Sequence, residues 1–255
     1  MQKSDIPRPS DIIVAMLVLT RLPMPAVSDA ALARVAPATW AFPLAGVMVA
    51  GLGALAGYGV VAAGLPAAVA AGVLLAVQIM ASGAMHEDGL ADVADGFWGG
   101  YTVKRRLEIM KDSMIGSYGV IALILSIGLR WVALTALVVH APEVAVAVAA
   151  LSRAGLPALM RLLPPARDDG MSHDIGAPPI FTCLLSALVG YGLAAMIAGG
   201  FVALIATGGV IAGLVIAALV AKWKIDGQTG DVLGASQQLG DIIALSLLAS
   251  LAVHM

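Results

Sequence analysis

Residues 201–221 read FVALIATGGVIAGLVIAALVA, an uncharged run of 21 residues in which only Thr207 carries a polar side chain. About 20 consecutive apolar residues are needed for an α-helix to cross a hydrocarbon core about 30 Å thick. In that environment only a helix or a closed barrel satisfies every backbone hydrogen-bonding group. The run therefore predicts a transmembrane helix, and with it the fold class of the chain.

Comparable apolar runs fill most of the remaining chain. Hydrophobic residues make up 60% of the 255 residues and charged residues 12%, whereas soluble domains are about 45–50% apolar and about 25% charged. The sequence predicts an all-α polytopic transmembrane bundle of about seven spans, within a range of six to eight, as a single integral membrane domain over residues 1–255. The other six predicted spans lie at about 40–64, 66–85, 115–140, 143–163, 179–199 and 236–255.

The basic residues predict the orientation of the chain, because Lys and Arg accumulate in the cytoplasmic loops of membrane proteins. With a cytoplasmic amino terminus, 12 of the 14 Lys and Arg residues fall on the inner side, and the other two, Arg130 and Arg153, fall within spans. The inner side then holds an interfacial arm at 1–39, an acidic segment at 86–114 and a glycine-rich loop at 222–235. We therefore expect the active site at the cytoplasmic face.

The remaining composition excludes several classes of protein. The net charge of −2 provides no basic field for nucleic acid. The single cysteine, Cys183, excludes an internal disulfide framework. Gly53 and Gly57 form a GxxxG pair that predicts close helix packing, and no strand precedes them as a nucleotide-binding loop would require. The sequence leaves the oligomeric state open, a homo-oligomer included.

Residues 86–96 read HEDGLADVADG and hold the most informative pattern. Asp88, Asp92 and Asp95 recur at i, i+4 and i+7, on one face of a helix predicted to continue from the second span. Like charges repel, so the pattern predicts a bound cation, and oxygen ligands suit Mg²⁺, Mn²⁺ or Ca²⁺. Glu87 lies off this face and is predicted to support the metal from beside it. A solvated helix end is the competing interpretation, although such a face usually includes lysines.

The following segment adds a fourth carboxylate, Asp112, just before the third span. Carboxylates, divalent cations and basic side chains together make a phosphoryl-transfer site, because metals clamp the attacking and leaving oxygens. Positive-inside topology accounts for the basic residues about equally well. The predicted catalytic residues are Asp88, Asp92 and Asp112, and the predicted phosphate-binding residues of this segment are Arg105, Lys111 and Ser113.

A second inner segment, residues 226–235, reads DGQTGDVLGA. Its glycines let a phosphate or nucleotide approach the backbone, so Thr229 and Asp231 are predicted to contact substrate. A flexible connector is the alternative, which composition alone slightly favours. Arg153 lies within a predicted span, where an ionisable group is expensive and indicates function. Arg153 and the loop residue Arg161 complete the predicted substrate-binding set.

Over nearly its whole length the chain resembles the cobalamin synthase family, the adenosylcobinamide-GDP ribazoletransferases. The motifs that carry the resemblance are, in order, residues 20–23 (TRLP), 86–96, 111–113 (KDS) with Gly116 and Gly119, and 229–231 (TGD) with Gly234 and Ala235. The resemblance implies an Mg²⁺-dependent enzyme of the bacterial cytoplasmic (inner) membrane. Such an enzyme joins adenosylcobinamide-GDP to α-ribazole or its 5′-phosphate, releases GMP and forms adenosylcobalamin or its 5′-phosphate. The implied partners are these two substrates and the lipid bilayer.

Three positions depart from the family pattern. Met114 stands where members often carry a basic residue, Gln238 stands where they usually carry Glu, and Asp241 replaces another Glu. Neither Met114 nor Gln238 is therefore predicted to bind phosphate or metal. The core aspartates are intact, so the predicted activity does not change.

Two other functions compete with this one. A secondary transporter would account for the spans and the intramembrane arginines, but transporters place ionisable sites near the membrane midplane, often between repeats. The acidic segment lies at the end of a span, and the chain shows no internal repeat. A CDP-alcohol-type phosphotransferase of lipid synthesis would share the metal chemistry. The released nucleotide distinguishes the three functions: GMP for the ribazoletransferase, CMP for the lipid synthase and neither for the transporter.

Overall fold

The computed structural model describes residues 6–253 and shows a chain built of helices. Residues 1–5 of the predicted arm and residues 254–255 of the last predicted span lie outside the described part. The described helices are α1 (Pro9–Leu19), α2 (Asp29–Leu32), α3 (Val35–Ala38), the 3₁₀ turn η2 (Thr39–Ala41), α4 (Phe42–Ala62), α5 (Ala67–Ser82), α6 (Met85–Gly99), α7 (Val103–Ile109), α8 (Ser117–Leu137), α9 (Glu143–Ala154), α10 (Leu156–Leu162), α11 (Met171–Ile175), α12 (Ile180–Ala198), α13 (Gly200–Ile225) and α14 (Gly230–Val253).

The prediction of a polytopic bundle is confirmed. Within the described residues, six helical segments are long and apolar enough to cross a membrane: 35–62, 117–137, 143–162, 180–198, 200–225 and 230–251. α5 and α6 meet the same criteria only as a pair bent by 86°, which would give a seventh span. We take α5 as the apolar part of that pair and α6 as the segment beyond the bend.

The centre of the bundle is α9, in which every side chain from Val144 to Ala154 is buried. α4, α12, α13 and α14 pack against it. The core between these helices consists mainly of Ala, Leu and Val side chains. Large apolar side chains such as Leu188, Leu204 and Leu219 remain exposed on the outer faces, as expected for helices in contact with lipid.

The predicted GxxxG pair packs α4 against α5. A Cβ added to Gly53 would lie 2.7 Å from the carbonyl oxygen of Leu74, and one added to Gly57 would lie 3.2 Å from that of Ala70. Because neither site has room for a side chain, the two backbones lie in direct contact. The packing role predicted for these glycines is confirmed.

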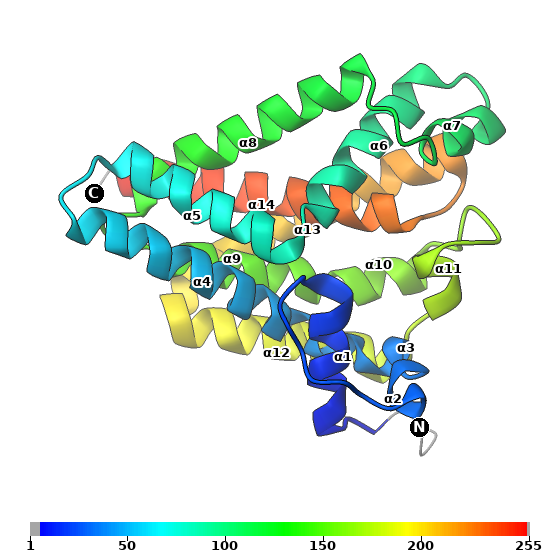
Figure 1. The fold of residues 1–255 in the computed structure, drawn as a ribbon, viewed down its shortest axis with the longest axis horizontal. Coiled ribbons are helices and arrows are strands. Elements are labelled where there is room, and N and C mark those ends of the chain that lie inside the picture. The colour runs from blue at the N-terminus through cyan, green and yellow to red at the C-terminus, as the bar shows by residue number, and fades with distance from the viewer. Residues whose placement is uncertain (1–5, 254–255) are drawn as a thin grey trace.

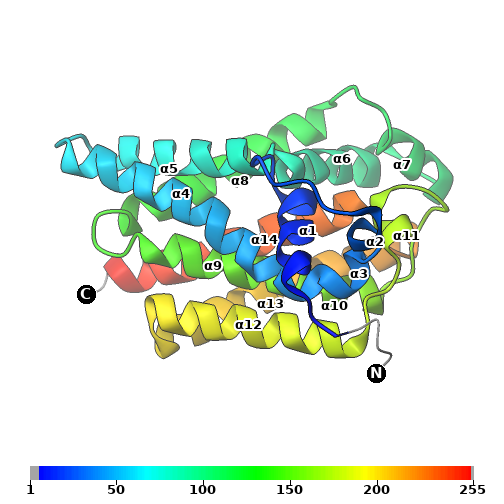
Figure 2. The same ribbon diagram turned by 60° about the horizontal axis from the view of Figure 1, so that its bottom comes forward.

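The two ends of the bundle differ in complexity. At one end the chain makes only the turns between α4 and α5, α8 and α9, and α12 and α13, where the C-terminus also lies (Figures 1 and 2). The other end gathers α1–α3, α6, α7, α11 and the beginning of α14 (Figures 1 and 2). The described parts of the three large segments predicted to share one side of the membrane, 6–39, 86–114 and 222–235, therefore lie at one end.

The predicted glycine-rich loop at 222–235 is mostly helical, which corrects the expected boundaries. α13 continues to Ile225, where Asp226 ends it in a left-handed conformation with φ of 57°. α14 begins at Gly230, six residues before the predicted start of the last span at Ser236. Tertiary packing explains the early start, because the first turns of α14 lie against α6.

The predicted interfacial arm also folds, into α1 and two short helices. Asp11 is fully buried, and its carboxylate lies 3.4 Å from Nε of Arg34 and accepts a hydrogen bond from Nε1 of Trp40 at 3.1 Å. These contacts fasten α1 to the entrance of α4. They place Leu19, the last residue of α1, beside the acidic segment.

Candidate active site

The acidic segment begins at a break between α5 and α6. Gly83 and Ala84 both adopt left-handed conformations, with φ of 68° and 57°, which is uncommon for alanine. Arg21 closes over this break: its amide donates to the Ala81 carbonyl at 2.8 Å, and a Cβ on Gly83 would lie 2.4 Å from its Cγ atom. α6 consequently turns by 86°. The predicted straight continuation of the second span into the acidic helix is therefore wrong.

Two glycines bring α6 and α14 together. A Cβ on Gly89 would lie 2.8 Å from the carbonyl oxygen of Asp231, and a Cβ on Gly234 would lie 3.2 Å from Cα of His86. Larger side chains at these positions would push the helices apart. The crossing therefore holds the first turn of α14 against the acidic helix, and it joins two of the predicted motifs.

Asp88, Asp92 and Asp231 form a cluster of like charges at this crossing. Burial and the neighbouring carboxylates, Asp231 foremost, raise the pKa of Asp92 to about 7, while the positive charge of Arg167 opposes the shift. The Thr229 hydroxyl donates to Oδ2 of Asp231 at 3.1 Å, and Nη2 of Arg167 lies 3.4 Å from the same oxygen. One arginine facing several carboxylates leaves the cluster deficient in positive charge.

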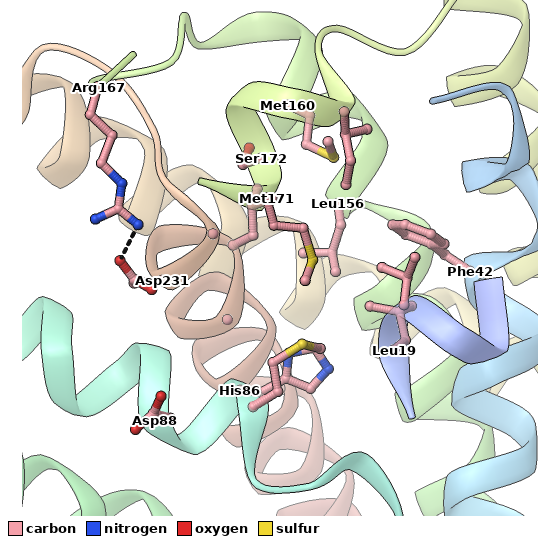
Figure 3. Close-up of a pocket in the computed structure, with 16 residues that line it drawn as sticks. Leu19, Phe42, His86, Asp88, Leu156, Met160, Arg167, Met171, Ser172 and Asp231 are labelled. Carbon is pink, nitrogen blue, oxygen red and sulfur yellow. Dashed lines mark hydrogen bonds and ion pairs between the residues drawn. The ribbon is translucent and has the colours of Figure 1, made fainter. Parts of the chain in front are cut away.

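A cavity of about 180 Å³ lies beside this cluster, between α1, α4, α10, α11 and the starts of α6 and α14. Asp88, Arg167 and Asp231 line one side of it (Figure 3). The opposite side is apolar and is formed by Leu19, Phe42, Leu156, Met160 and Met171 (Figure 3). The cavity thus has a charged end and an apolar end, an arrangement that suits a ligand with the same two parts.

Asp95, a predicted metal ligand, instead caps the first turn of α8. Its Oδ2 accepts from the Gly116 amide at 2.7 Å and its Oδ1 from the Gly119 amide at 2.9 Å. A Cβ on either glycine would lie 2.4 Å from this carboxylate. A carboxylate here satisfies amides that have no partner within the helix and complements the helix dipole. The two motif glycines therefore make room for Asp95.

Glu87 is buried within the bundle and is paired with Arg130. Its Oε1 lies 3.0 Å from Nη2 of Arg130 and accepts from Nε2 of Gln238 at 3.1 Å. Gln238 in turn accepts from the Ser126 hydroxyl at 2.9 Å. These bonds join α6 to α8 and α14, so Glu87 and the intramembrane Arg130 hold the acidic helix in place.

Arg153, predicted to bind substrate, is buried among helices and does not line the cavity. Its guanidinium donates to the Ala149 carbonyl at 3.2 Å. Nearby, Nε2 of Gln237 donates to Ser152 at 3.2 Å and to Asp241 at 2.6 Å. Within the described residues, the Arg153 Nε and Asp241 Oδ1 atoms have no hydrogen-bond partner. The structure therefore places Arg153 in a buried polar network behind the site.

The predicted residues of the 105–113 segment lie in an exposed region. Lys111 is ion-paired with Asp169, and the Asp112 carboxylate accepts from the Met114 amide at 3.1 Å. The side chain of Ser113 is exposed. Two predicted arginines also have protein partners: Arg105 is 3.2 Å from Glu108 and Arg161 donates to the Pro178 carbonyl at 3.0 Å.

The five predicted metal ligands are thus not gathered at one point. In the described part of the chain, no three His, Cys, Asp or Glu side chains are arranged so that they could hold a metal ion. Asp95 and Glu87 have other partners, and Asp112 lies in a separate exposed loop. Of the predicted set, Asp88 and Asp92 remain at the crossing. The structure adds Asp231, which the sequence assigned to substrate binding.

Arg167 and His86 are the residues that sequence reasoning left out of the site. Arg167 reaches Asp231 because the loop after α10 pairs with the residues just before α14: the Ala166 amide donates to the Gln228 carbonyl at 2.8 Å. A Cβ on Gly227 would lie 2.4 Å from the Pro164 carbonyl oxygen. Gly227 is therefore the sequence feature that marks this contact, because a glycine leaves room for the close approach.

Known proteins that are similar to this chain share one family description and one name. The family model described as cobalamin-5-phosphate synthase matches residues 11–249. Among curated relatives, proteins named adenosylcobinamide-GDP ribazoletransferase from Bradyrhizobium diazoefficiens and Mesorhizobium japonicum are 45% and 42% identical, each over 248 residues. These alignments cover 94% and 95% of this chain and 94% and 93% of the relatives.

A third relative of the same name, from Azorhizobium caulinodans, is 42% identical over 250 residues, which covers 92% of this chain and 94% of the relative. No solved structure gives a significant match.

Proposed function

The chain belongs to the cobalamin-5-phosphate synthase family of membrane transferases, and from this premise we propose that it joins adenosylcobinamide-GDP to α-ribazole or α-ribazole 5′-phosphate. The observation that carries the proposal is the cluster at the α6–α14 crossing. Asp88 and Asp231 line a cavity together with Arg167, and Asp92 lies within electrostatic reach of both carboxylates. Carboxylates beside a guanidinium are the groups that phosphoryl transfer uses.

The transfer exchanges one P–O bond for another. The ribose 3′-hydroxyl oxygen of α-ribazole bonds to the phosphorus that carries the cobinamide side chain. The bond from that phosphorus to the bridging oxygen of the GMP moiety breaks, and GMP leaves. The hydroxyl proton passes to a carboxylate of the cluster or to solvent. The product is adenosylcobalamin, or its 5′-phosphate when the acceptor is phosphorylated.

Asp88, Asp92 and Asp231 have the chemistry to hold Mg²⁺, or Mn²⁺ in its place. Their oxygens are the hard ligands that these ions prefer, and only one guanidinium, that of Arg167, faces these carboxylates within the described residues. Mg²⁺ is usually held by one or two carboxylates together with substrate phosphates and water. A substrate-free site therefore does not need three converged protein ligands. When bound, the ion would neutralise charge on the transferring phosphoryl group.

Arg167 is the protein's own cation at the cluster. Its side chain is 18% exposed, one face lies against Asp231, and its buried Nη1 atom has no partner within the described residues. A guanidinium with free N–H groups binds phosphate oxygens in a fixed geometry. We assign Arg167 to the pyrophosphate of adenosylcobinamide-GDP. The exposed Arg105 and Lys111 remain candidates for the same substrate.

The proposed location is the bacterial cytoplasmic (inner) membrane, with the site at its cytoplasmic face. The charge distribution supports this orientation, since the segments that carry most of the basic residues lie at the same end of the bundle as the cluster (Figure 1). Short turns connect the helices at the opposite end.

Product analysis tests the proposed function. Purified protein in liposomes would receive adenosylcobinamide-GDP and α-ribazole 5′-phosphate with Mg²⁺, and the products would be separated by chromatography and identified by mass. We expect GMP and adenosylcobalamin 5′-phosphate in equal amounts. CMP release from a CDP-alcohol with no GMP would indicate the lipid synthase, and the absence of any covalent product would indicate a transporter.

A further inference from the structure

The apolar end of the cavity has the form of a binding site for a flat ring. Its walls come from α1, α4, α10 and α11, through Leu19, Phe42, Met160 and Met171 (Figure 3). Phe offers a ring face for stacking, and methionine adapts to aromatic groups and contacts them favourably through its sulfur. The volume of about 180 Å³ leaves room for a bicyclic ring.

His86 contributes a polar side chain to the lining of this cavity. The residue is only 3% exposed, yet its Nε2 atom has no hydrogen-bond partner within the described residues. Figure 3 shows its ring at the cavity, near Leu19 and Met171. A buried nitrogen without a partner is unfavourable unless a ligand or water supplies one. The backbone of His86 is fixed by the close packing of Gly234, so the ring has a defined position.

The imidazole of His86 supplies the hydrogen-bonding group of this end. A neutral imidazole carries one N–H donor and one acceptor nitrogen. The apolar end thus presents several apolar walls and a single directed polar group.

We propose that this cavity binds the benzimidazole base of the α-ribazole acceptor, with the imidazole of His86 donating a hydrogen bond to the unsubstituted ring nitrogen. This inference rests on the proposed function. A benzimidazole base has apolar faces and edges and one free nitrogen acceptor, which one donor satisfies. Guanine carries donors and acceptors around most of its edge, and most of them would be buried unpaired against these walls. The ring that fits is therefore that of the acceptor, not that of the leaving nucleotide.

The same placement directs the reacting hydroxyl. With the base in the apolar end, the attached ribose extends toward the charged end, where Asp88, Asp231 and Arg167 lie. Holding the hydroxyl beside the phosphoryl group accelerates transfer through proximity and orientation. The base pocket and the carboxylate cluster are thus two ends of one site.

Two cavity variants with matched controls test this proposal. Met160→Trp fills the apolar end, and Met196→Trp makes the same change on the exposed outer face of α12. His86→Phe removes the donor while keeping a ring, and His140→Phe repeats it at the exposed opposite end of the bundle. His86→Gln retains an N–H donor and controls for misfolding, and monodispersity in detergent is checked for each protein.

The readouts are the KM for each substrate and equilibrium dialysis of α-ribazole, with and without adenosylcobinamide-GDP. We expect Met160→Trp and His86→Phe to raise the KM and the Kd for α-ribazole about tenfold or more. We also expect an unchanged KM for adenosylcobinamide-GDP, partial recovery in His86→Gln, and no displacement of α-ribazole by guanosine. The controls should behave as wild type.

Three results would overturn the base pocket. These are wild-type affinity for α-ribazole in Met160→Trp, a defect confined to adenosylcobinamide-GDP, and displacement of α-ribazole by guanosine. Each leaves the transferase function intact if GMP is still released. A protein that binds α-ribazole in the cavity but releases no GMP would refute the proposed function instead.

Discussion

Nη2 of Arg167 lies 3.4 Å from Oδ2 of Asp231, although 64 positions separate the two residues in the chain. The contact joins the loop after α10 to the first turn of α14, and α14 in turn packs on α6 through Gly89 and Gly234. Three segments distant in sequence therefore meet at one point. This meeting makes Asp231 part of the same acidic cluster as Asp88 and Asp92.

Removing single charges from that cluster should strongly lower turnover without unfolding the protein. We expect Asp88→Asn, Asp92→Asn and Asp231→Asn each to lower the rate of GMP release at least about 100-fold, the scale of losing one electrostatic stabiliser. Asp226→Asn is the matched control, because Asp226 is exposed and forms an ion pair with Lys222, away from the cluster. Near-normal rates in Asp88→Asn and Asp92→Asn would rule out the cluster.

The buried Glu87–Arg130 pair should contribute to stability. Arg130→Gln leaves the Glu87 carboxylate buried with one partner fewer, and breaking such a pair costs roughly 3–5 kcal/mol. Arg105→Gln removes an exposed pair with Glu108 and should cost less than about 1 kcal/mol. Unfolding in detergent, followed by circular dichroism, measures both. Equal midpoints for the two variants would show that the buried pair is not a stabilising contact.

The crossing of α13 and α14 should not tolerate even a methyl group. A Cβ on Gly213 would lie 2.5 Å from the Gly240 amide nitrogen, whereas nothing lies within 4 Å of a Cβ on Gly208 of the same helix. Gly213→Ala should therefore lower the unfolding midpoint. Gly208→Ala should leave the unfolding midpoint unchanged or raise it slightly, since Ala is about 1 kcal/mol more favourable than Gly within a helix. An unchanged unfolding midpoint in Gly213→Ala would mean that α13 and α14 lie farther apart than in the structure.

The orientation of the chain can be read by chemical labelling. Ser113→Cys, made in a Cys183→Ser background, should react with a membrane-impermeant thiol reagent only from the cytoplasmic side, because the basic segments share that end. Ser113 is exposed in the structure, so the reagent has access. Labelling of intact cells from outside would reverse the topology and place the active site on the opposite face.

The sequence predicted the parts of the fold that depend on local pattern. Largely apolar runs of span length predicted the membrane helices, and the Gly53–Gly57 spacing predicted the α4–α5 contact, because both properties are set by neighbouring residues. The bend at Gly83 and Ala84 was missed, since Arg21 from a distant segment stabilises it. The early start of α14 was missed for the same reason: packing on α6 outweighs a glycine-rich composition.

The sequence also predicted the acidic segment but not the task of each carboxylate. Spacing alone does not distinguish Asp88, Asp92 and Asp95. In the structure, Asp95 accepts hydrogen bonds from the α8 amides, and Glu87 is ion-paired with Arg130. Those partners lie 21 to 43 positions away, beyond any helical period. Arg167 shows no local pattern, and only the fold brings it to Asp231.

The dependence of turnover on the divalent cation tests the central claim most directly. Protein in liposomes would be stripped with excess chelator, and GMP release would be followed as Mg²⁺, Mn²⁺ or Ca²⁺ is returned. We predict no turnover in chelator, recovery with Mg²⁺ or Mn²⁺, and poor recovery with Ca²⁺, whose larger and looser coordination suits in-line displacement less well. Full turnover in excess chelator would contradict the account, because Asp88, Asp92 and Asp231 would then have no cation through which to act.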